Sequence, residues 1–307
     1  MTTIQAFIKR HPVLTYFVLT FVISWGGILL VIGGPSSIPA NSEQAETLVL
    51  FVLLALFAGP SVAGMLLTGL VNGKAGFREL LSRLLRWRVG ARWYAVALLF
   101  APLLVTVVLL ALARISPVFL PRILSTSDKA SLLLFGIVWG LIGGGLLEEL
   151  GWTGFAIPQL RQRYGVLTTG FIVGVLWGAW HFLVTLWLSG DASGALSLAI
   201  FLPASIFYGG SLPAYRVFMV WVYDRTHGSL PVTMLMHASF SASRLILNPL
   251  ALALVPALAY DFIVAAALWV VIAVIVVAQK RASLRRRPPE AQLSQHGQVP
   301  ANVRPSE

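Results

Sequence analysis

Long apolar runs separated by short polar segments dominate the chain. A hydrocarbon layer of roughly 30 Å is crossed by about 20 helical residues, and runs of that length recur along the whole sequence. This pattern predicts an all-α fold, a polytopic transmembrane bundle of about eight helices. The predicted spans are 13–33, 47–71, 93–113, 131–157, 166–188, 196–223, 229–247 and 257–279.

The sixth predicted span is the most irregular. It is interrupted by Pro203, Gly209, Gly210 and Pro213. Such breaks persist in a membrane only where neighbouring groups satisfy the freed backbone, so this span can consist of two pieces.

Composition agrees with the membrane class. Hydrophobic residues make up 58% of the 307 residues and charged ones only 11%, which leaves too little polar surface to coat a soluble globule of this size. The chain has no cysteine. This excludes a disulfide framework, a thiolate metal site and a cysteine nucleophile.

The net charge of +11 lies mostly between the apolar runs. Such a charge would point to nucleic acid in a soluble protein, but here it fits cytoplasmic anchoring of spans, so no nucleic-acid partner is expected. The bias predicts a cytoplasmic N-terminus at 1–12, a transmembrane domain at 13–279 and a disordered basic cytoplasmic tail at 280–307. The basic segment Gly73–Arg92 is either an amphipathic helix along the inner interface or a plain anchor loop.

Among the eleven acidic residues and five histidines, only Glu148, Glu149, His181 and His237 lie well inside predicted spans. A carboxylate in hydrocarbon costs several kcal/mol, about 3 on insertion scales, so it needs internal partners or a function. Counted from the predicted cytoplasmic ends of their spans, all four lie within about 12 to 22 Å. Three helices can therefore bring them to one cavity.

Helical spacing adds neighbours to this set. Trp177 lies at i−4 from His181, whereas Ser241 and Arg244 share the face of His237. The two adjacent glutamates point about 100° apart, so one of them is expected to have a supporting role.

The same residues admit three kinds of explanation. A carboxylate and a histidine can activate water for amide hydrolysis while a second histidine donates to the oxyanion. Glu148, His181 and His237 can instead bind a divalent metal such as zinc that activates water. Intramembrane histidines can also simply bridge helices, Glu149 paired with an arginine can be structural, and the tryptophans can serve packing.

Three motifs resemble those of a known family. They are Glu148-Glu149-Leu150-Gly151-Trp152-Thr153-Gly154-Phe155, Trp177-Gly178-Ala179-Trp180-His181 and His237-Ala238-Ser239-Phe240-Ser241. Their order and spacing are similar to those of the CAAX prenyl protease type II family, also called CPBP or ABI, over about 136–247. The resemblance implies an eight-helix bundle with a peptidase site inside the membrane. Some members are described as metalloproteases and others as metal-independent glutamate proteases.

The resemblance also implies roles for individual residues. The family patterns are E-E-x-x-x-R, F-x-x-x-H and H-x-x-x-N, which imply that Glu148 and His181 activate water and that His237 helps to form the oxyanion hole. This chain departs from them at three positions, where Thr153 replaces Arg, Trp177 replaces Phe and Ser241 replaces Asn. Glu149 therefore lacks its expected arginine, although the Thr153 hydroxyl can donate one hydrogen bond to it.

The leading hypothesis is an intramembrane endopeptidase acting on a membrane-associated peptide or a lipid-modified protein. A catalytically impaired relative that serves as a membrane immunity or scaffold protein is the alternative from another class. A proton-coupled transporter would also bury Glu and His, but no internal repeat is evident in the sequence.

Overall fold

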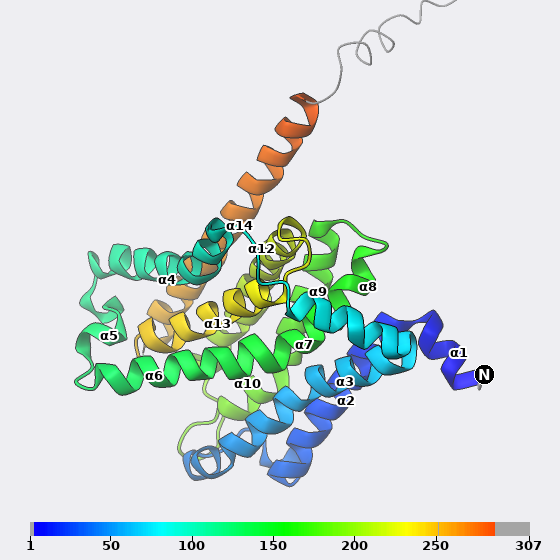
Figure 1. Ribbon diagram of the computed structural model, residues 1–307. Coiled ribbons are helices and arrows are strands. Elements are labelled where there is room, and N and C mark those ends of the chain that lie inside the picture. Colours follow the sequence, from blue (N-terminus) through cyan, green and yellow to red (C-terminus); the bar gives the residue numbers. More distant parts are fainter. Residues whose placement is uncertain (1–2, 251, 286–307) are drawn as a thin grey trace, which may run out of the picture.

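The computed structural model describes residues 3–250 and 252–285 (Figure 1). Over this range the chain is helical, apart from loops and a single isolated bridge between Gly190 and Leu196. Eight helical runs are long and apolar enough to cross a membrane, which confirms the predicted fold class. Their bounds are Pro12–Ile32, Ser42–Leu84, Ala91–Ala113, Lys129–Arg161, Val166–Leu188, Leu198–Arg225, Leu230–Leu247 and Leu254–Arg281.

Several of these runs consist of more than one helix. The α-helices are α1 (Thr3–Arg10), α2 (Pro12–Ile32), α3 (Ser42–Leu84), α4 (Ala91–Ala113), α5 (Arg122–Ser125), α6 (Lys129–Trp139), α7 (Glu149–Gly151), α8 (Ile157–Arg161), α9 (Val166–Trp180), α10 (Phe182–Leu188), α11 (Leu198–Ile206), α12 (Leu212–Arg225), α13 (Leu230–Leu247) and α14 (Leu254–Arg285).

The last helix is longer than the sequence indicates. Residues 280–285, which the sequence analysis places in a disordered tail, are the end of α14, and this helix projects beyond the bundle in Figure 1. The remaining part of that predicted tail, 286–307, lies outside the described residues.

Helix α3 contains a sharp turn at Gly73. This residue has φ 58° and ψ −146°, a conformation that is accessible to glycine but not to ordinary side chains. The first part of α3 is the second span, and the part after Gly73 forms a short basic helix. Of the two alternatives for Gly73–Arg92, a helix is therefore present to Leu84, whereas residues 86–90 are not helical.

The fourth span is a widened helix. Gly140–Glu148 and Trp152–Ala156 are π-helical and flank the single turn of α7. A π-turn inserts extra residues into a helix and re-aims the side chains that follow, and such turns often occur at functional sites. Glycine is required here by close packing against α13, because a Cβ on Gly140 would lie 2.3 Å from the Ala238 carbonyl oxygen.

The sixth span is one continuous helical run and not two pieces. A π-turn at Phe207–Ser211 joins α11 to α12 and accommodates the glycines and prolines that the sequence analysis treats as breaks. Its partner α9 presents Gly170, Gly174 and Gly178 at intervals of one turn. A Cβ on any of the three would come within 2.5 Å of the backbone of the sixth span, so these glycines allow the two helices to pack backbone to backbone.

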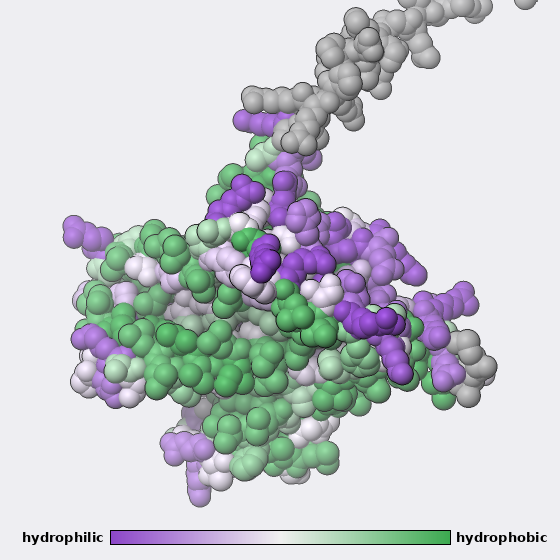
Figure 2. Space-filling view, viewed as in Figure 1, coloured by the Kyte–Doolittle hydropathy of each residue, from purple (hydrophilic) through white to green (hydrophobic). Residues whose placement is uncertain are grey.

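The surface matches a membrane environment. Hydrophobic residues cover most of the face shown in Figure 2, and hydrophilic residues gather toward the side from which α14 projects. Many large apolar side chains, such as Leu30, Val107 and Leu134, are well over half exposed. In water such a surface would aggregate, whereas in a bilayer it contacts lipid. The chain is therefore an integral multi-pass membrane protein.

Candidate active site

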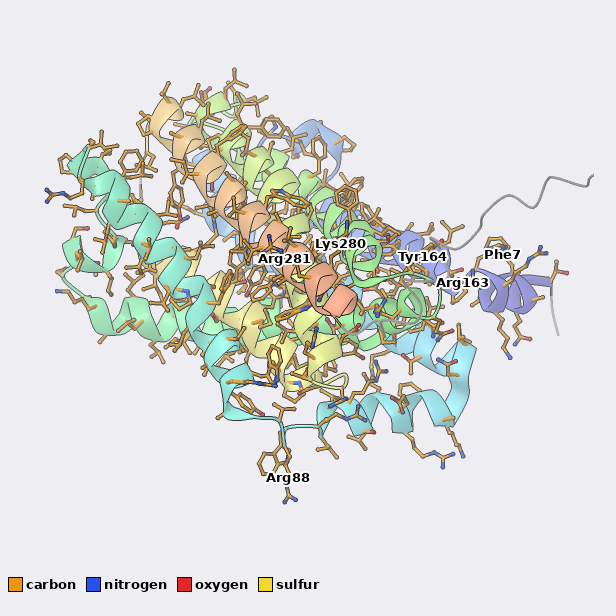
Figure 3. All side chains as sticks on the ribbon, turned by 90° about the horizontal axis from the view of Figure 1, so that it is seen from above. Phe7, Arg88, Arg163, Tyr164, Lys280 and Arg281 are labelled. Carbon is orange, nitrogen blue, oxygen red and sulfur yellow. The ribbon has the colours of Figure 1, made fainter. Side chains whose placement is uncertain are left out.

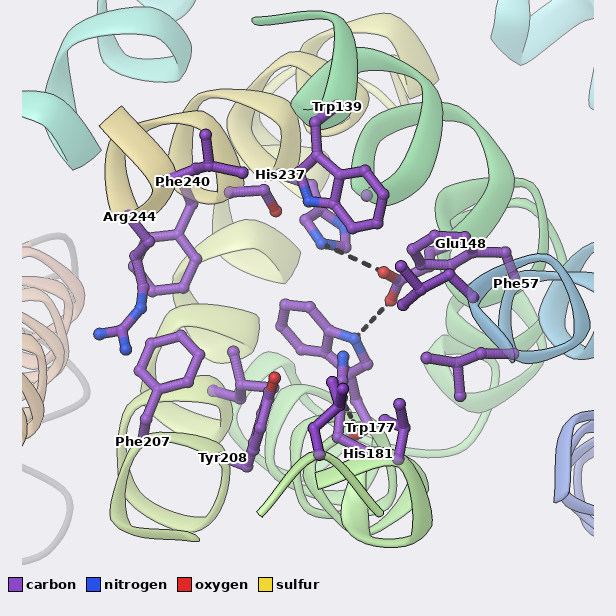
Figure 4. Close-up of a pocket in the computed structure, with 18 of the residues that line it drawn as sticks. Phe57, Trp139, Glu148, Trp177, His181, Phe207, Tyr208, His237, Phe240 and Arg244 are labelled. Carbon is purple, nitrogen blue, oxygen red and sulfur yellow. Dashed lines mark hydrogen bonds and ion pairs between the residues drawn. The ribbon is translucent and has the colours of Figure 1, made fainter. Parts of the chain in front are cut away.

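A cavity of about 440 Å³ lies between the helical runs that carry the three motifs (Figure 4). All four predicted catalytic residues line it, namely Glu148, His181, His237 and Ser241. Of the predicted supporting residues, Trp177 and Arg244 also line it, whereas Glu149 and Thr153 lie behind the wall. The rest of the lining is mainly apolar and aromatic, with Phe57, Trp139, Phe207, Tyr208 and Phe240 among its members.

The carboxylate of Glu148 is held by two indole rings. Trp177 Nε1 donates to Glu148 Oε2 at 2.6 Å, and Trp152 Nε1 donates to the same oxygen at 3.1 Å. Both indoles are buried. Oε2 is thus occupied, while Oε1 lies 3.8 Å from His237 Nε2. The tryptophans at these two positions therefore orient the carboxylate as well as pack, a role that the sequence analysis assigns to neither.

His237 lies between the two glutamates. Its Nδ1 is 2.7 Å from Glu149 Oε1, and its Nε2 faces Glu148 across the cavity wall. A carboxylate that is paired with a cation only accepts hydrogen bonds, so His237 Nδ1 carries the proton of this contact. Nε2 then either bears a lone pair, in the neutral ring, or a second proton, in the imidazolium.

Glu149 is neutralised from another helix. Arg216 of α12 places Nη1 at 2.8 and 2.9 Å from the two oxygens of Glu149, and both side chains have 0% exposure. Thr153 Oγ1 donates to Oε2 in a short hydrogen bond, as expected for a hydroxyl one turn away. The expectation that Glu149 lacks a cationic partner because Thr153 replaces Arg is therefore wrong.

Arg216 also contacts Trp177, which lines the cavity. Its guanidinium stacks over the Trp177 ring at 4.1 Å, and Trp177 is a donor to Glu148. The approach of α12 to the glycines of α9 makes this reach possible, because a Cβ on Gly174 would lie 3.1 Å from the Arg216 Cβ. Sequence reasoning missed Arg216, although an arginine inside the predicted span 196–223 was a visible signal.

His181 stands where the fifth span changes from α9 to α10. Its Nδ1 is 2.9 Å from the Trp177 carbonyl oxygen, which can only accept, so Nδ1 is the protonated nitrogen and Nε2 has a lone pair. The ring stacks on Tyr208 with a centroid distance of 4.2 Å and contacts Trp180 edge-on. These contacts fix the plane of the ring beside the cavity.

Ser241 lies one helical turn from His237 on the same wall. A Cβ built on Gly144 would lie 2.7 Å from the His237 ring and 2.8 Å from Ser241 Oγ. The imidazole and the hydroxyl therefore converge on the bare backbone of the fourth span, and only glycine leaves room for both.

Arg244 is already paired. Its Nη1 is 2.8 Å from Asp261 Oδ1 of α14, and its guanidinium lies 3.6 Å from the centroid of the Phe207 ring. Arg244 lines the same cavity as His237, as its position on the same helical face predicts. Its partner Asp261, at the start of the last span, was not predicted.

The described residues contain no group of three or more His, Asp or Glu side chains that could hold a metal ion. Glu148, His181 and His237 share the cavity, yet Glu148 Oε2 accepts two indole donors and His237 Nδ1 is bound to Glu149. These contacts leave Glu148 Oε1 and the Nε2 atoms of both histidines for the cavity. The zinc ligand set therefore stays a prediction, and the scheme below uses only the side chains of the protein.

Comparisons with known proteins agree with the motifs. Residues 129–243 match the family model described as type II CAAX prenyl endopeptidase Rce1-like. Among curated proteins, CAAX prenyl protease 2 of Methanococcus maripaludis is 25% identical over 175 residues, which cover 57% of this chain and 62% of that relative. The chain thus matches less than two thirds of its relative's length. Eight spans, three motifs in the expected order and these two matches together show that the chain is similar to the CAAX prenyl proteases of type II, the CPBP family, over the region that holds the cavity.

Proposed function

We propose that this protein is an intramembrane endopeptidase in which Glu148 activates water to hydrolyse a peptide bond. The observation that carries the proposal is the orientation of Glu148. Its carboxylate faces a membrane-embedded cavity, with one oxygen held by two indoles and the other turned toward His237. A structural carboxylate would be satisfied on both oxygens by buried donors, as Glu149 is.

The reaction needs a base, a water and donors for the oxyanion. Glu148 takes a proton from a water whose oxygen attacks the carbonyl carbon, and the lone pair of His181 Nε2 accepts the second hydrogen bond of that water. The developing oxyanion is stabilised by His237 Nε2–H and Ser241 Oγ–H. Glu148 then passes its proton to the departing amine nitrogen, which leaves an acid and an amine as products.

The buried ion pair gives His237 its role in this scheme. Because Nδ1 is already donated to Glu149, Nε2 can donate only as the imidazolium. Glu149 accepts the Nδ1–H bond that orients the ring, and Arg216 pairs with both oxygens of Glu149. Arg216 is therefore proposed as a positioning residue of the site.

The substrate proposed is a membrane-associated peptide or lipid-modified protein. The mostly apolar and aromatic lining of the cavity can accept apolar side chains or a lipid group. The name of the relative points to a prenylated C-terminal motif. Quenched peptides with and without a prenylated cysteine near the C-terminus compare these two substrate classes directly.

The experiment that tests the peptidase is the change Glu148→Gln in purified protein in detergent. This change keeps the size of the side chain and removes the base, so the rate should fall by about 10²–10⁴-fold while thermal unfolding stays close to wild type. Glu79→Gln, a change at an exposed carboxylate outside the cavity, is the matched control. Undiminished cleavage by Glu148→Gln would rule out its role, and tight binding of peptide without cleavage by wild type would support the scaffold alternative.

The proposed orientation has both termini in the cytoplasm, as the distribution of Lys and Arg predicts. Because the chain lacks native cysteine, single cysteines report it cleanly. Ser193→Cys should react with an impermeant maleimide from outside, and Ser82→Cys should react only after the membrane is opened. The reverse labelling pattern would mean that the protein has the opposite orientation in the membrane.

A further inference from the structure

A second cavity lies away from the candidate active site, where the start of the first span meets the connection between the fourth and fifth spans. Its volume is about 240 Å³. It is lined by Arg10, His11, Pro12, Val13 and Leu14 from the α1–α2 junction, and by Gln159, Leu160, Gln162, Arg163, Tyr164 and Ile172 from α8, α9 and the turn between them.

The charged side chains that line this cavity, among the described residues, are all basic. Arg10 and Arg163 line it, and no Asp or Glu does. Neither arginine takes part in an ion pair within the described residues. The neighbouring Arg161 differs, because it is bound bidentately by Asp224. Two free guanidinium groups with an imidazole and amide donors beside them form a receptor for an anion with several oxygens, of which phosphate is the common example.

The surroundings of the cavity belong to the interface between lipid and water. Helix α1 has basic Lys9 and Arg10 in its last turn, while Ile4 is 73% and Phe7 52% exposed. A short helix with exposed apolar residues next to cationic ones lies in the plane of the headgroups. Figure 3 shows Arg163 and Tyr164 at the end of the bundle where α1, with Phe7, extends outward.

Below the cavity the surface becomes apolar. Leu14, which lines the cavity, is 56% exposed, and Val18 follows one turn further along α2 with 53% exposure. Free phosphate would use only the charged end of this site. A ligand with a phosphate and a hydrocarbon chain would use both the basic cavity and the apolar side of α2.

We propose that this cavity binds the headgroup of an anionic phospholipid, with an acyl chain lying along the exposed side of α2. The phosphate contacts Arg10 and Arg163, while Gln159 and Gln162 donate to the headgroup. Since a water molecule occupies about 30 Å³, a volume of this size holds a phosphate with several waters. The lipid would thereby join the first span to the loop that follows the fourth span, which carries Glu148.

The test is the binding of lipid to the purified full-length protein. The protein in a zwitterionic detergent is titrated with phosphatidylglycerol or phosphatidylcholine, and bound lipid is counted by native mass spectrometry while thermal unfolding is followed. Phosphatidylglycerol should bind and raise the Tm more than phosphatidylcholine. Arg10→Gln/Arg163→Gln should weaken its binding roughly 30-fold, given the usual contribution of each basic residue near an anionic lipid.

The control variant is Arg78→Gln/Arg88→Gln, which removes the same charge from the basic segment outside the cavity and should leave binding unchanged. If both double variants bound phosphatidylglycerol equally well, the lipid would be held by general attraction to basic residues, and the proposal of a specific site would be overturned. An equal, arginine-dependent Tm shift with inorganic phosphate alone, without a further effect of lipid, would assign the cavity to free phosphate and refute the lipid. Peptide cleavage in detergent should be unaffected by either variant.

Discussion

The buried pair of Arg216 and Glu149 offers the sharpest perturbation of the site. Arg216→Met keeps an unbranched side chain of similar length and removes the guanidinium, which leaves Glu149, at 0% exposure, without its arginine partner. Removing one partner of a buried pair typically destabilises a protein by about 3–5 kcal/mol. Arg216 would no longer hold Glu149 in place as the acceptor of His237 Nδ1–H, and loss of one oriented oxyanion donor lowers kcat by roughly 100-fold or more.

A variant that carries the arginine at position 153 separates the role of Arg216 in positioning His237 from its contribution to stability. Thr153 already contacts Glu149, so Thr153→Arg/Arg216→Met moves the cation to the position that the family pattern gives it. This double variant should regain at least about tenfold in kcat over Arg216→Met, even after a cost of about 1–3 kcal/mol for repacking. A third variant, Glu149→Gln/Arg216→Met, removes both charges, so it should unfold near the wild-type temperature yet remain slow.

The assays are thermal unfolding in detergent and kcat with one quenched peptide. Arg161→Met is the matched control, because it breaks the partly exposed pair with Asp224 and should cost no more than about 1 kcal/mol without changing kcat. If Glu149→Gln/Arg216→Met cleaved at the wild-type rate, the ion pair would be structural only. If Thr153→Arg/Arg216→Met folded but was no faster than Arg216→Met, an arginine at position 153 could not replace Arg216, and the reasoning would be refuted.

Four further outcomes follow from the cavity. Gly144→Ala should abolish cleavage, because its Cβ would lie 2.7 Å from the His237 ring; wild-type kcat would mean that this ring is not where the chemistry occurs. Trp177→Phe, the family-like residue, should lower kcat about 10-fold or more through loss of the charge-assisted bond to Glu148, and an unchanged rate would show that Trp152 alone orients it. Ser241→Asn should raise kcat with little change in KM, since the longer amide acts mainly in the transition state; a KM effect alone would contradict this. Incubation with a chelator, followed by its removal, should leave the rate unchanged, and recovery that required added zinc would refute the metal-free scheme.

The spans were predictable because hydropathy is a local property of the sequence. The fifth predicted span, 166–188, coincides with Val166–Leu188, and the third differs from Ala91–Ala113 only at its start. The π-turns were not predictable from helical periodicity. They depend on long-range packing, such as the approach of the Ala238 carbonyl to Gly140, and no count of apolar residues contains that contact.

Part of the candidate site was predictable because ionisable residues within apolar runs are also a local property of the sequence. Glu148, His181 and His237 stand out because ionisable residues are costly within apolar runs. Their partners were harder to assign. Trp152 and Trp177 have the composition of packing residues, and only the geometry of Glu148 identifies them as donors. Asp261 was missed because it lies near the start of its span, where a charge carries little cost.

Arg216 and Thr153 are best understood together. A buried carboxylate requires a cation within contact distance, but this requirement fixes the position of the guanidinium and not the helix from which it comes. In this chain the glycines of α9 bring α12 close enough for Arg216 to reach Glu149, which leaves position 153 free for a hydroxyl that donates to the same carboxylate. The departure from the motif at Thr153 is thus compensated by a residue outside the motif. In this chain, the pairing of the second glutamate is therefore better judged by whether any helix supplies a cation to it than by the motif alone.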